Sequence, residues 1–225
     1  MKVLIFDAGP IINFSINGML DVLESLKNNF KGKFIITEAV KKEVIDYPLN
    51  VPRFELGALR VQALLNKGVL ELPSSLNIDN EIIKKESLRL MNIANHYVSS
   101  KGTWINILSE GETSCLALSS ELTKQNIENI IAIDERTTRI LAEKPQNLQK
   151  IISDRLHSNV KAQLSNLEEF YNFKFIRSTE LVYIAFKKGL LNIQGKKALE
   201  AALYATKFKG SSVTFEEIEE LKKLN

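Results

Sequence analysis

The hydrophobic positions along the chain fall into short continuous apolar runs and longer stretches with helical spacing. The continuous runs are typical of strands buried on both faces of a parallel sheet. They cover residues 2–7, 33–36, 68–73, 129–134 and 173–177. Apolar residues three or four positions apart predict amphipathic helices between these runs. The predicted helices cover residues 11–26, 38–46, 60–66, 79–99, 109–122, 135–144, 178–191, 196–208 and 214–224.

Local signals mark where several of these elements begin and end. Thr37 is a predicted N-cap, and Ser109 stands three residues before Glu112, the spacing of a capping box. Gly32 is expected to end the first helix, and two prolines and a glycine predict a loop over residues 48–58. The alternation of strands and helices predicts an α/β fold.

Length and composition predict one domain. The chain has 225 residues, 44% of them hydrophobic, which is enough for one sizeable core. We therefore expect a single domain over residues 1–225, with an elaboration at about 73–108 and a helical part at about 178–225. A net charge of +3 permits a polyanionic partner without requiring one.

Cysteine content and hydropathy indicate the cellular compartment in which the protein is expected. Cys115 is the only cysteine, so no intrachain disulfide can form, and a reducing, cytoplasmic location is expected. The N-terminal apolar run is short and leads into an acidic residue, unlike a signal peptide. No apolar stretch reaches the roughly 18 residues that a membrane span needs, so no membrane partner is expected.

Four acidic residues are candidates for a shared site. Asp7 and Asp134 each close a predicted buried strand, where a carboxylate is costly unless something pairs with it. The carboxyl ends of parallel strands meet at one edge of a sheet, so the two should lie near each other. Glu43 follows in the next helix, and Glu112 joins them only if its helix begins at the same edge. A crossing connection within residues 73–108 would allow that.

Each acid also has a purely structural explanation. Asp7 and Asp134 could cap the helices that follow them, and Glu112 could be the reciprocal partner of its capping box. Glu43 lies among charged neighbours and could be solvated surface. Capping does not require two acids at the ends of two strands of one sheet, so the set as a whole favours a site.

Four segments of the chain resemble, in order, the motifs of the PIN-domain family. They are residues 7–12 (DAGPII), 36–44 (ITEAVKKEV), 111–119 (GETSCLALS) and 131–139 (IAIDERTTR). The first is similar to the Asp-Ala-Ser-Pro-Leu-Ile opening of one subgroup, and residues 178–190 are similar to the closing helix. The chain differs from the residues that are common in these family motifs at Thr113, Ser114 and Thr138. The segment 73–108 is longer than the usual PIN core.

The resemblance implies both a fold and a chemistry. The fold is a three-layer α/β/α sandwich with a central, mostly parallel sheet of about five strands. In VapC-like members the acids matching Asp7, Glu43, Glu112 and Asp134 would line a divalent-metal site. Oxygen-only ligands suit Mg²⁺ or Mn²⁺, which can activate water and neutralise charge on a phosphate. The expected activity is therefore hydrolysis of single-stranded RNA, with one metal or two.

Several residues could contact that RNA. Thr37 could hydrogen-bond a ligand or water, and Arg136 and Arg139 could contact phosphate, although both arginines could equally be solvated helix charge. Lysines with interleaved aromatics could form an electrostatic track, or a solubilising surface around core aromatics. These residues are Lys187, Lys188, Lys196, Lys197, Lys207 and Lys209, with Phe186, Tyr204 and Phe208.

Other functions fit the sequence less well. A haloacid-dehalogenase-type phosphatase needs a second acid two residues after Asp7, where Gly9 stands, and dinucleotide binding lacks a glycine-rich phosphate turn. Cys115 is expected to be packed core rather than a nucleophile. The alternative outside enzymes is a PIN-like scaffold that binds RNA or protein. The resemblance also allows a toxin with an antitoxin or other regulatory partner, and a homodimer; the 73–108 segment could bind a partner, gate the site or drive dimerisation.

Overall fold

A four-stranded parallel sheet forms the centre of the molecule. The computed structural model describes residues 1–163, 167–195 and 197–224. The strands are β1 (Lys2–Phe6), β2 (Gly32–Ile35), β5 (Glu128–Ala132) and β7 (Phe175–Ile176), in the order β2-β1-β5-β7. Every pairing is parallel, with Leu4 opposite Phe34 on one side and opposite Ile130 on the other. Their carboxyl ends therefore share one edge, as the sequence predicted.

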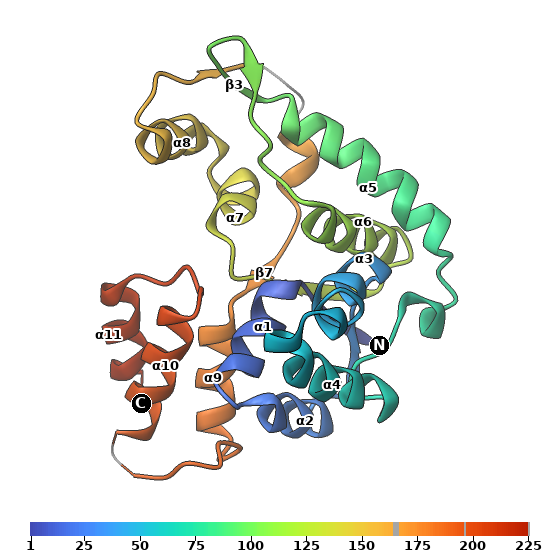
Figure 1. Cartoon of the computed structure of the whole chain (residues 1–225), viewed down its shortest axis with the longest axis vertical. Coiled ribbons are helices and arrows are strands. Elements are labelled where there is room, and N and C mark those ends of the chain that lie inside the picture. Colours follow the sequence, from blue (N-terminus) through green and yellow to red (C-terminus); the bar gives the residue numbers. More distant parts are fainter. Residues whose placement is uncertain (164–166, 196, 225) are drawn as a thin grey trace.

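Helices cover both faces of this sheet, and the predicted three-layer α/β/α arrangement is confirmed (Figure 1). On one face α6 (Glu110–Lys124) packs against β1 and β5, and α5 (Asn80–Asn95) packs against α6. On the other lie α1 (Ala8–Ile16), α2 (Leu20–Asn29) and α9 (Ser178–Lys187), which contact one another. The successive apolar residues of β1 explain why both faces are covered, because their side chains point to the two faces in turn and each face must bury its own set.

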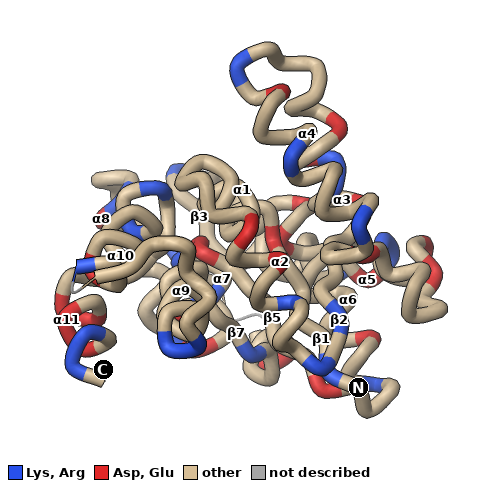
Figure 2. The backbone as a smooth tube through the Cα atoms, turned by 90° about the horizontal axis from the view of Figure 1, so that it is seen from below, with Lys and Arg blue, Asp and Glu red and all other residues tan. Residues whose placement is uncertain are grey.

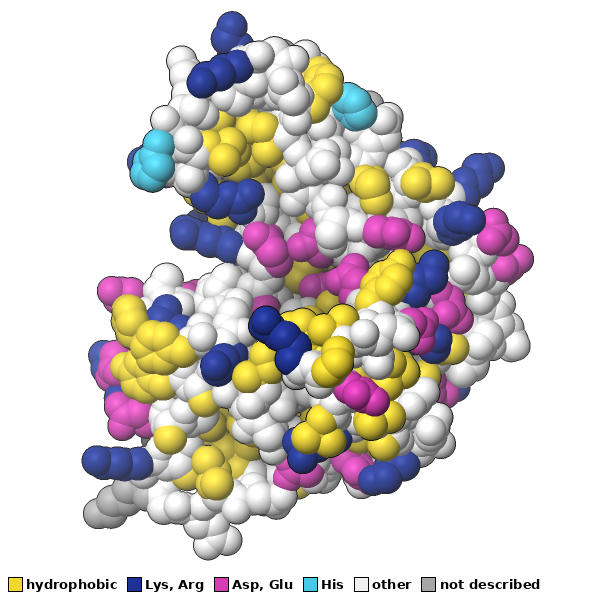
Figure 3. Space-filling model, in the orientation of Figure 1, with side chains coloured by type: hydrophobic (Ala, Val, Ile, Leu, Met, Phe, Trp, Pro, Cys, Tyr) yellow, Lys and Arg dark blue, Asp and Glu magenta, His cyan; other side chains and the backbone are white. Residues whose placement is uncertain are grey.

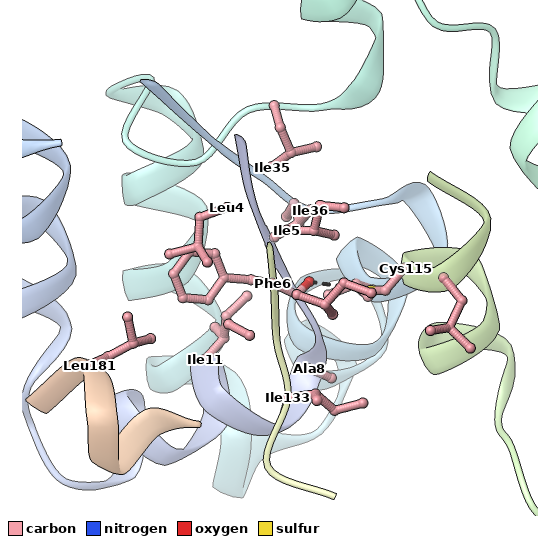
Figure 4. Packing of buried hydrophobic residues seen from close by; sticks show 14 of the residues in the cluster. Leu4, Ile5, Phe6, Ala8, Ile11, Ile35, Ile36, Cys115, Ile133 and Leu181 are labelled. Atoms are coloured by element: carbon pink, nitrogen blue, oxygen red, sulfur yellow. Dashed lines mark hydrogen bonds between the residues drawn. The ribbon is translucent and has the colours of Figure 1, made fainter. Parts of the chain in front are cut away.

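The hydrophobic core is continuous through β1. Figure 4 shows Leu4 and Phe6 packed with Ile11 and Leu181 on one side, and Cys115 close to Phe6. Cys115 is fully buried, which confirms that it is packed core. Its thiol donates to the Phe6 carbonyl oxygen at 3.6 Å, so it is held against the end of the strand that leads into Asp7.

Three predicted elements were wrong. The helix expected over residues 11–26 is two helices, because Gly18 has a positive φ of 68° that ends the first. The expected loop over 48–58 is a short 3-10 turn followed by α4 (Pro52–Asn66), since Pro52 stands in the first turn, where a missing N–H costs nothing. The expected strand over 68–73 is a single parallel bridge from Ile35 to Glu71.

Part of the structure had no counterpart in the predicted pattern. Strands β3 (Val98–Ser100), β4 (Thr103–Trp104) and β6 (Lys161–Ala162) form a small antiparallel sheet, and α8 (Leu148–Leu156) is a further helix. Figure 1 shows these elements gathered at the end of the molecule away from α2 and α4. The segment 73–108, which the sequence marked as an elaboration, contains a 3-10 turn (Pro73–Leu76), α5 and two of these strands, and α5 packs against α6.

Three helices form the C-terminal part. It contains α9, α10 (Ala198–Phe208) and α11 (Phe215–Lys223). Arg177 joins this part to the sheet: its buried guanidinium is ion-paired with Glu180 and with Glu217, the latter at 2.9 Å, and donates to the Ser212 carbonyl at 3.2 Å. No helix among the described residues is both long and apolar enough to span a membrane.

Candidate functional site

Asp7 is buried directly after β1, with 6% of its surface exposed. It is the N-cap of α1, accepting a hydrogen bond from the Gly9 backbone N–H at 3.4 Å, so the capping explanation holds as far as local structure goes. Burial, together with the charges of Glu112 and Glu43, raises its pKa to about 7. A cap alone would not require this surrounding of like charge.

Glu43 reaches this site from a tightly constrained position. It lies in a π-helical turn, Lys42–Asp46, that continues α3 (Glu38–Lys41); such turns are frequent at functional sites. Its carboxylate rests against Gly111 of α6, where a Cβ atom would lie only 2.6 Å from Glu43 Oε1. Burial and the charge of Glu110 raise the pKa of Glu43, while the Gly111 N–H works in the opposite direction.

Glu112 is both a capping residue and a member of the acidic group. Its carboxylate accepts a hydrogen bond from Ser109 N–H at 2.7 Å and Ser109 Oγ accepts one from Glu112 N–H at 3.3 Å, which completes the predicted capping box. It is also 8% exposed, and burial together with the charge of Glu135 raises its pKa. Its charge also acts on Asp7, which directly follows β1, so the first turn of α6 lies at the same edge as the carboxyl ends of the strands.

Asp134 is separated from Asp7 by Gly9 and is held by hydrogen-bond donors. A Cβ on Gly9 would lie 3.6 Å from Asp7 Oδ2 and 3.5 Å from Asp134 Cβ. The Asp134 carboxylate accepts bonds from Ser178 N–H at 2.8 Å, Ser211 Oγ at 3.0 Å and Asn13 Nδ2 at 3.3 Å. Burial raises the pKa of Asp134 and these donors lower it. Asp134 does not cap α7, so that structural alternative is wrong.

The residues predicted to contact substrate lie in three different settings. Thr37 caps α3 by accepting from the Val40 N–H, and its hydroxyl is 2.6 Å from that of Ser114. Arg136 is exposed at the start of α7 (Arg136–Glu143). Arg139 is paired with Glu143 at 3.5 Å, with only 18% of its side chain exposed. Among the two arginines, Arg136 has the freedom to meet a ligand.

Sequence reasoning missed two acids and two donors beside these carboxylates. Glu135 caps α7 and its charge acts on Glu112, and Glu110 acts on Glu43. Glu135 directly follows Asp134, and Glu110 directly precedes Gly111, against which Glu43 rests. This closeness in sequence was the signal that could have identified both acids. Asn13 and Ser211 hold Asp134, and nothing in the local pattern marked them.

The predicted lysine track does not form one surface. Lys188 lines an apolar hollow near the start of β1, whereas Lys207 lines a cleft beside Arg136. Lys196 lies outside the described residues. The aromatics Tyr204 and Phe208 do stack on each other, with ring centroids 6.2 Å apart, and Phe215 joins them.

The sequence matches the model of a protein family described as a PIN domain over residues 3–149. The chain belongs to the PIN-domain family. No curated protein and no solved structure matches it. The matched PIN segment contains Asp7, Glu43, Glu112 and Asp134, while α8 to α11 lie beyond it, apart from the first residues of α8.

PIN domains are generally metal-dependent nucleases, and the acids of this PIN domain fit a divalent cation by their chemistry. They offer only oxygen, the ligand that Mg²⁺ and Mn²⁺ prefer, and all four have raised pKa values, which a cation would relieve. Buried hydroxyl oxygens without hydrogen-bond partners in the described chain, at Ser178 and Thr138, lie next to this group. No three of the described His, Cys, Asp or Glu side chains converge on one point as they stand.

The neighbouring residues Ser211 and Ser212 allow the hydrogen bond from Ser211 to Asp134 to be tested. Ser211→Ala removes a donor to Asp134, and we expect the free energy of unfolding to fall by about 1.5 kcal/mol. The hydroxyl of Ser212 is buried without a partner among the described residues, so Ser212→Ala should leave stability unchanged or raise it. Urea denaturation of both variants measures the difference. Equal destabilisation would mean that the hydroxyl bond to Asp134 contributes nothing.

Proposed function

We propose that this PIN domain is a Mg²⁺- or Mn²⁺-dependent endoribonuclease that hydrolyses single-stranded RNA. The observation that carries the proposal is Asp7, a buried carboxylate at the end of the central strand whose pKa is raised to about 7 by burial and by the charges of Glu112 and Glu43. Such repulsion destabilises the fold unless a cation compensates it, which favours a metal site over a cap.

In this proposal each residue has a distinct part. Asp7, Glu43 and Glu112 would hold the cation, and Asp134, fixed by its three donors, would complete the site across Gly9. The bound cation supplies an activated water and neutralises charge developing on the phosphate. Thr37 positions the start of the helical segment that carries Glu43, and Arg136, which is exposed at the start of α7, would contact a substrate phosphate.

The second candidate is a scaffold that binds RNA or protein without cutting it. It is favoured by one observation: the described side chains do not converge into a ready three-ligand set, and the Asp134 carboxylate is already satisfied by protein donors. A toxin role with an antitoxin, and a homodimer, are further proposals. Exposed apolar residues on α4, which stands out from the body in Figure 2, offer a surface for such partners. These residues are Phe54, Leu56 and Leu59.

The decisive experiment measures cleavage of labelled single-stranded RNAs with Mg²⁺, Mn²⁺ or a chelator. The double variant Asp7→Asn, Asp134→Asn, purified identically, controls for contaminating nuclease. We expect metal-dependent cleavage by the natural chain and none by the variant. Cleavage that survives in the variant would come from a contaminant. If the natural chain neither cleaves nor is stabilised by metal, the scaffold is the better description.

A further inference from the structure

Two adjoining hollows lie beside the acidic residues. They have volumes of about 650 and 600 Å³ and share Arg136, Asn147 and Ile151 in their walls. Glu135 lines one hollow, and Ser211, the donor to Asp134, lines the other. Figure 3 shows the indentation between the part that carries α7 and α8 and the part that carries α10 and α11, with acidic side chains at its inner end. We name the two hollows together the basic cleft.

Four of the cations that line the basic cleft have no acidic partner. Arg136, Lys144, Lys150 and Arg155 are all exposed, and none forms an ion pair within the described residues. Acids also line the cleft, but Glu143 is neutralised by Arg139 at 3.5 Å and Glu217 by Arg177 at 2.9 Å. Three acids, Glu135, Asp154 and Glu216, remain against these four cations and Lys207. Unpaired cations on a concave surface raise the local concentration of anions.

An aromatic side chain stands at the other wall of the basic cleft. Phe215 begins α11, lines the cleft and is 51% exposed. Its ring is fixed by neighbours: Tyr204 and Phe208 have centroids 6.1 and 6.3 Å away, and the Lys207 ammonium is 4.2 Å from its centroid. A rigid exposed ring beside cations is the arrangement on which an unpaired base can stack while its phosphates are neutralised.

We infer that the basic cleft binds single-stranded RNA, with phosphates on Lys150 and Arg155 and a base stacked against Phe215. This rests on the proposed ribonuclease function for the choice of RNA, and it extends that function by naming the path along which the strand leaves the acidic residues. Lys150, Arg155 and Phe215 all lie beyond the matched PIN segment, which ends at residue 149. The added helices therefore carry the substrate surface of this particular chain.

Binding is measured without metal, so that it does not depend on cleavage. Fluorescence anisotropy with a labelled single-stranded RNA in chelator compares the natural chain with Lys150→Ala, Arg155→Ala and with Phe215→Leu. The matched control is Lys84→Ala, Lys85→Ala, which removes the same charge from exposed positions on α5. Circular dichroism melting confirms that each variant is folded.

We expect a specific pattern of losses. The slope of log affinity against log salt should fall by roughly 1.4 in Lys150→Ala, Arg155→Ala, because about 0.7 is lost for each single-strand phosphate contact. Phe215→Leu should weaken single-strand binding about 5- to 150-fold while hardly changing binding of a duplex of the same sequence. The α5 control should bind like the natural chain.

Three results would overturn this inference: no RNA binding by the natural chain, an unchanged salt slope in the double variant, or an equal loss in the α5 control. An unchanged affinity in Phe215→Leu would overturn the stacking contact. The outcome is separable from that of the proposed function. If the natural chain binds RNA through these residues but does not cut it, the RNA-binding cleft is supported and the nuclease function is refuted. If the natural chain cuts RNA and the cleft variants bind RNA as it does, the nuclease function is supported and the RNA-binding cleft is refuted.

Discussion

Asp7→Asn is expected to stabilise the metal-free protein at neutral pH and to reduce metal-dependent RNA cleavage at least about 100-fold. Even partners that only orient a metal ligand cost about 10- to 100-fold when removed, so a ligand should cost at least the upper value. The gain in stability has a separate cause. Asparagine can still cap α1, but it removes a buried charge that lies close to Glu112 and Glu43.

The sign of this effect follows from the pKa of Asp7. Folding raises it from 3.8 to about 7, so the folded state prefers the protonated carboxyl. Stability linked to this group is complete below pH 3.8 and is lost as the pH rises to about 7. The loss amounts to about 4 kcal/mol at neutral pH. Asp7→Asn avoids it, so the advantage of the variant should grow from about pH 4 to about pH 7 and level off above that.

Urea denaturation in chelator at several pH values measures this advantage, with Asp154→Asn, an exposed aspartate of α8, as the control. Mg²⁺ or Mn²⁺ should raise the melting temperature of the natural chain and should have little effect on Asp7→Asn, because the cation binds only the folded state. If Asp7→Asn is instead less stable than the natural chain at pH 8, Asp7 is a structural cap and the metal-site proposal loses its main support.

The sequence was sufficient for those features that follow from strand ends and helix caps. Parallel strands place Asp7 and Asp134 at one edge, and the capping box of Ser109 and Glu112 fixes where α6 begins. Both signals are local, involve few residues and depend on backbone groups that must be satisfied. The resemblance added the order of the motifs, and the matched family agrees with it over residues 3–149.

The remaining features depend on contacts between distant segments. The donor from Ser211 reaches Asp134 across 77 residues, and only the packing of α10 and α11 brings it there. Strands of two or three residues, such as β4 and β6, are too short to show a periodicity. The sequence predicted Pro52 to be a loop residue, although it begins α4. Proline is common both in turns and in the first turn of a helix, so its presence does not distinguish the two.

Gly111→Ala is expected to leave the fold intact and to reduce cleavage by about 10- to 100-fold. Alanine is favoured over glycine within a helix by about 0.5–1 kcal/mol, so α6 should not weaken. The new Cβ, however, would lie 2.6 Å from Glu43 Oε1, which is closer than atoms can approach. Because the contact is with the end of a flexible side chain, Glu43 moves and the backbone does not, and the carboxylate is displaced from the acidic residues.

Two further variants make this prediction specific. Gly57→Ala adds the same methyl group to α4, where its Cβ meets only Ser15 Oγ at 3.1 Å, and it should cleave RNA like the natural chain. Glu43→Gln, which removes the charge without moving the side chain, should lose at least as much cleavage as Gly111→Ala. Melting temperatures and metal titrations complete the comparison: the weaker metal response should appear in Gly111→Ala without a lower melting temperature in chelator. Full activity in Gly111→Ala would show that the position of Glu43 does not matter for the reaction, because the added methyl group leaves its carboxylate no room where it now lies.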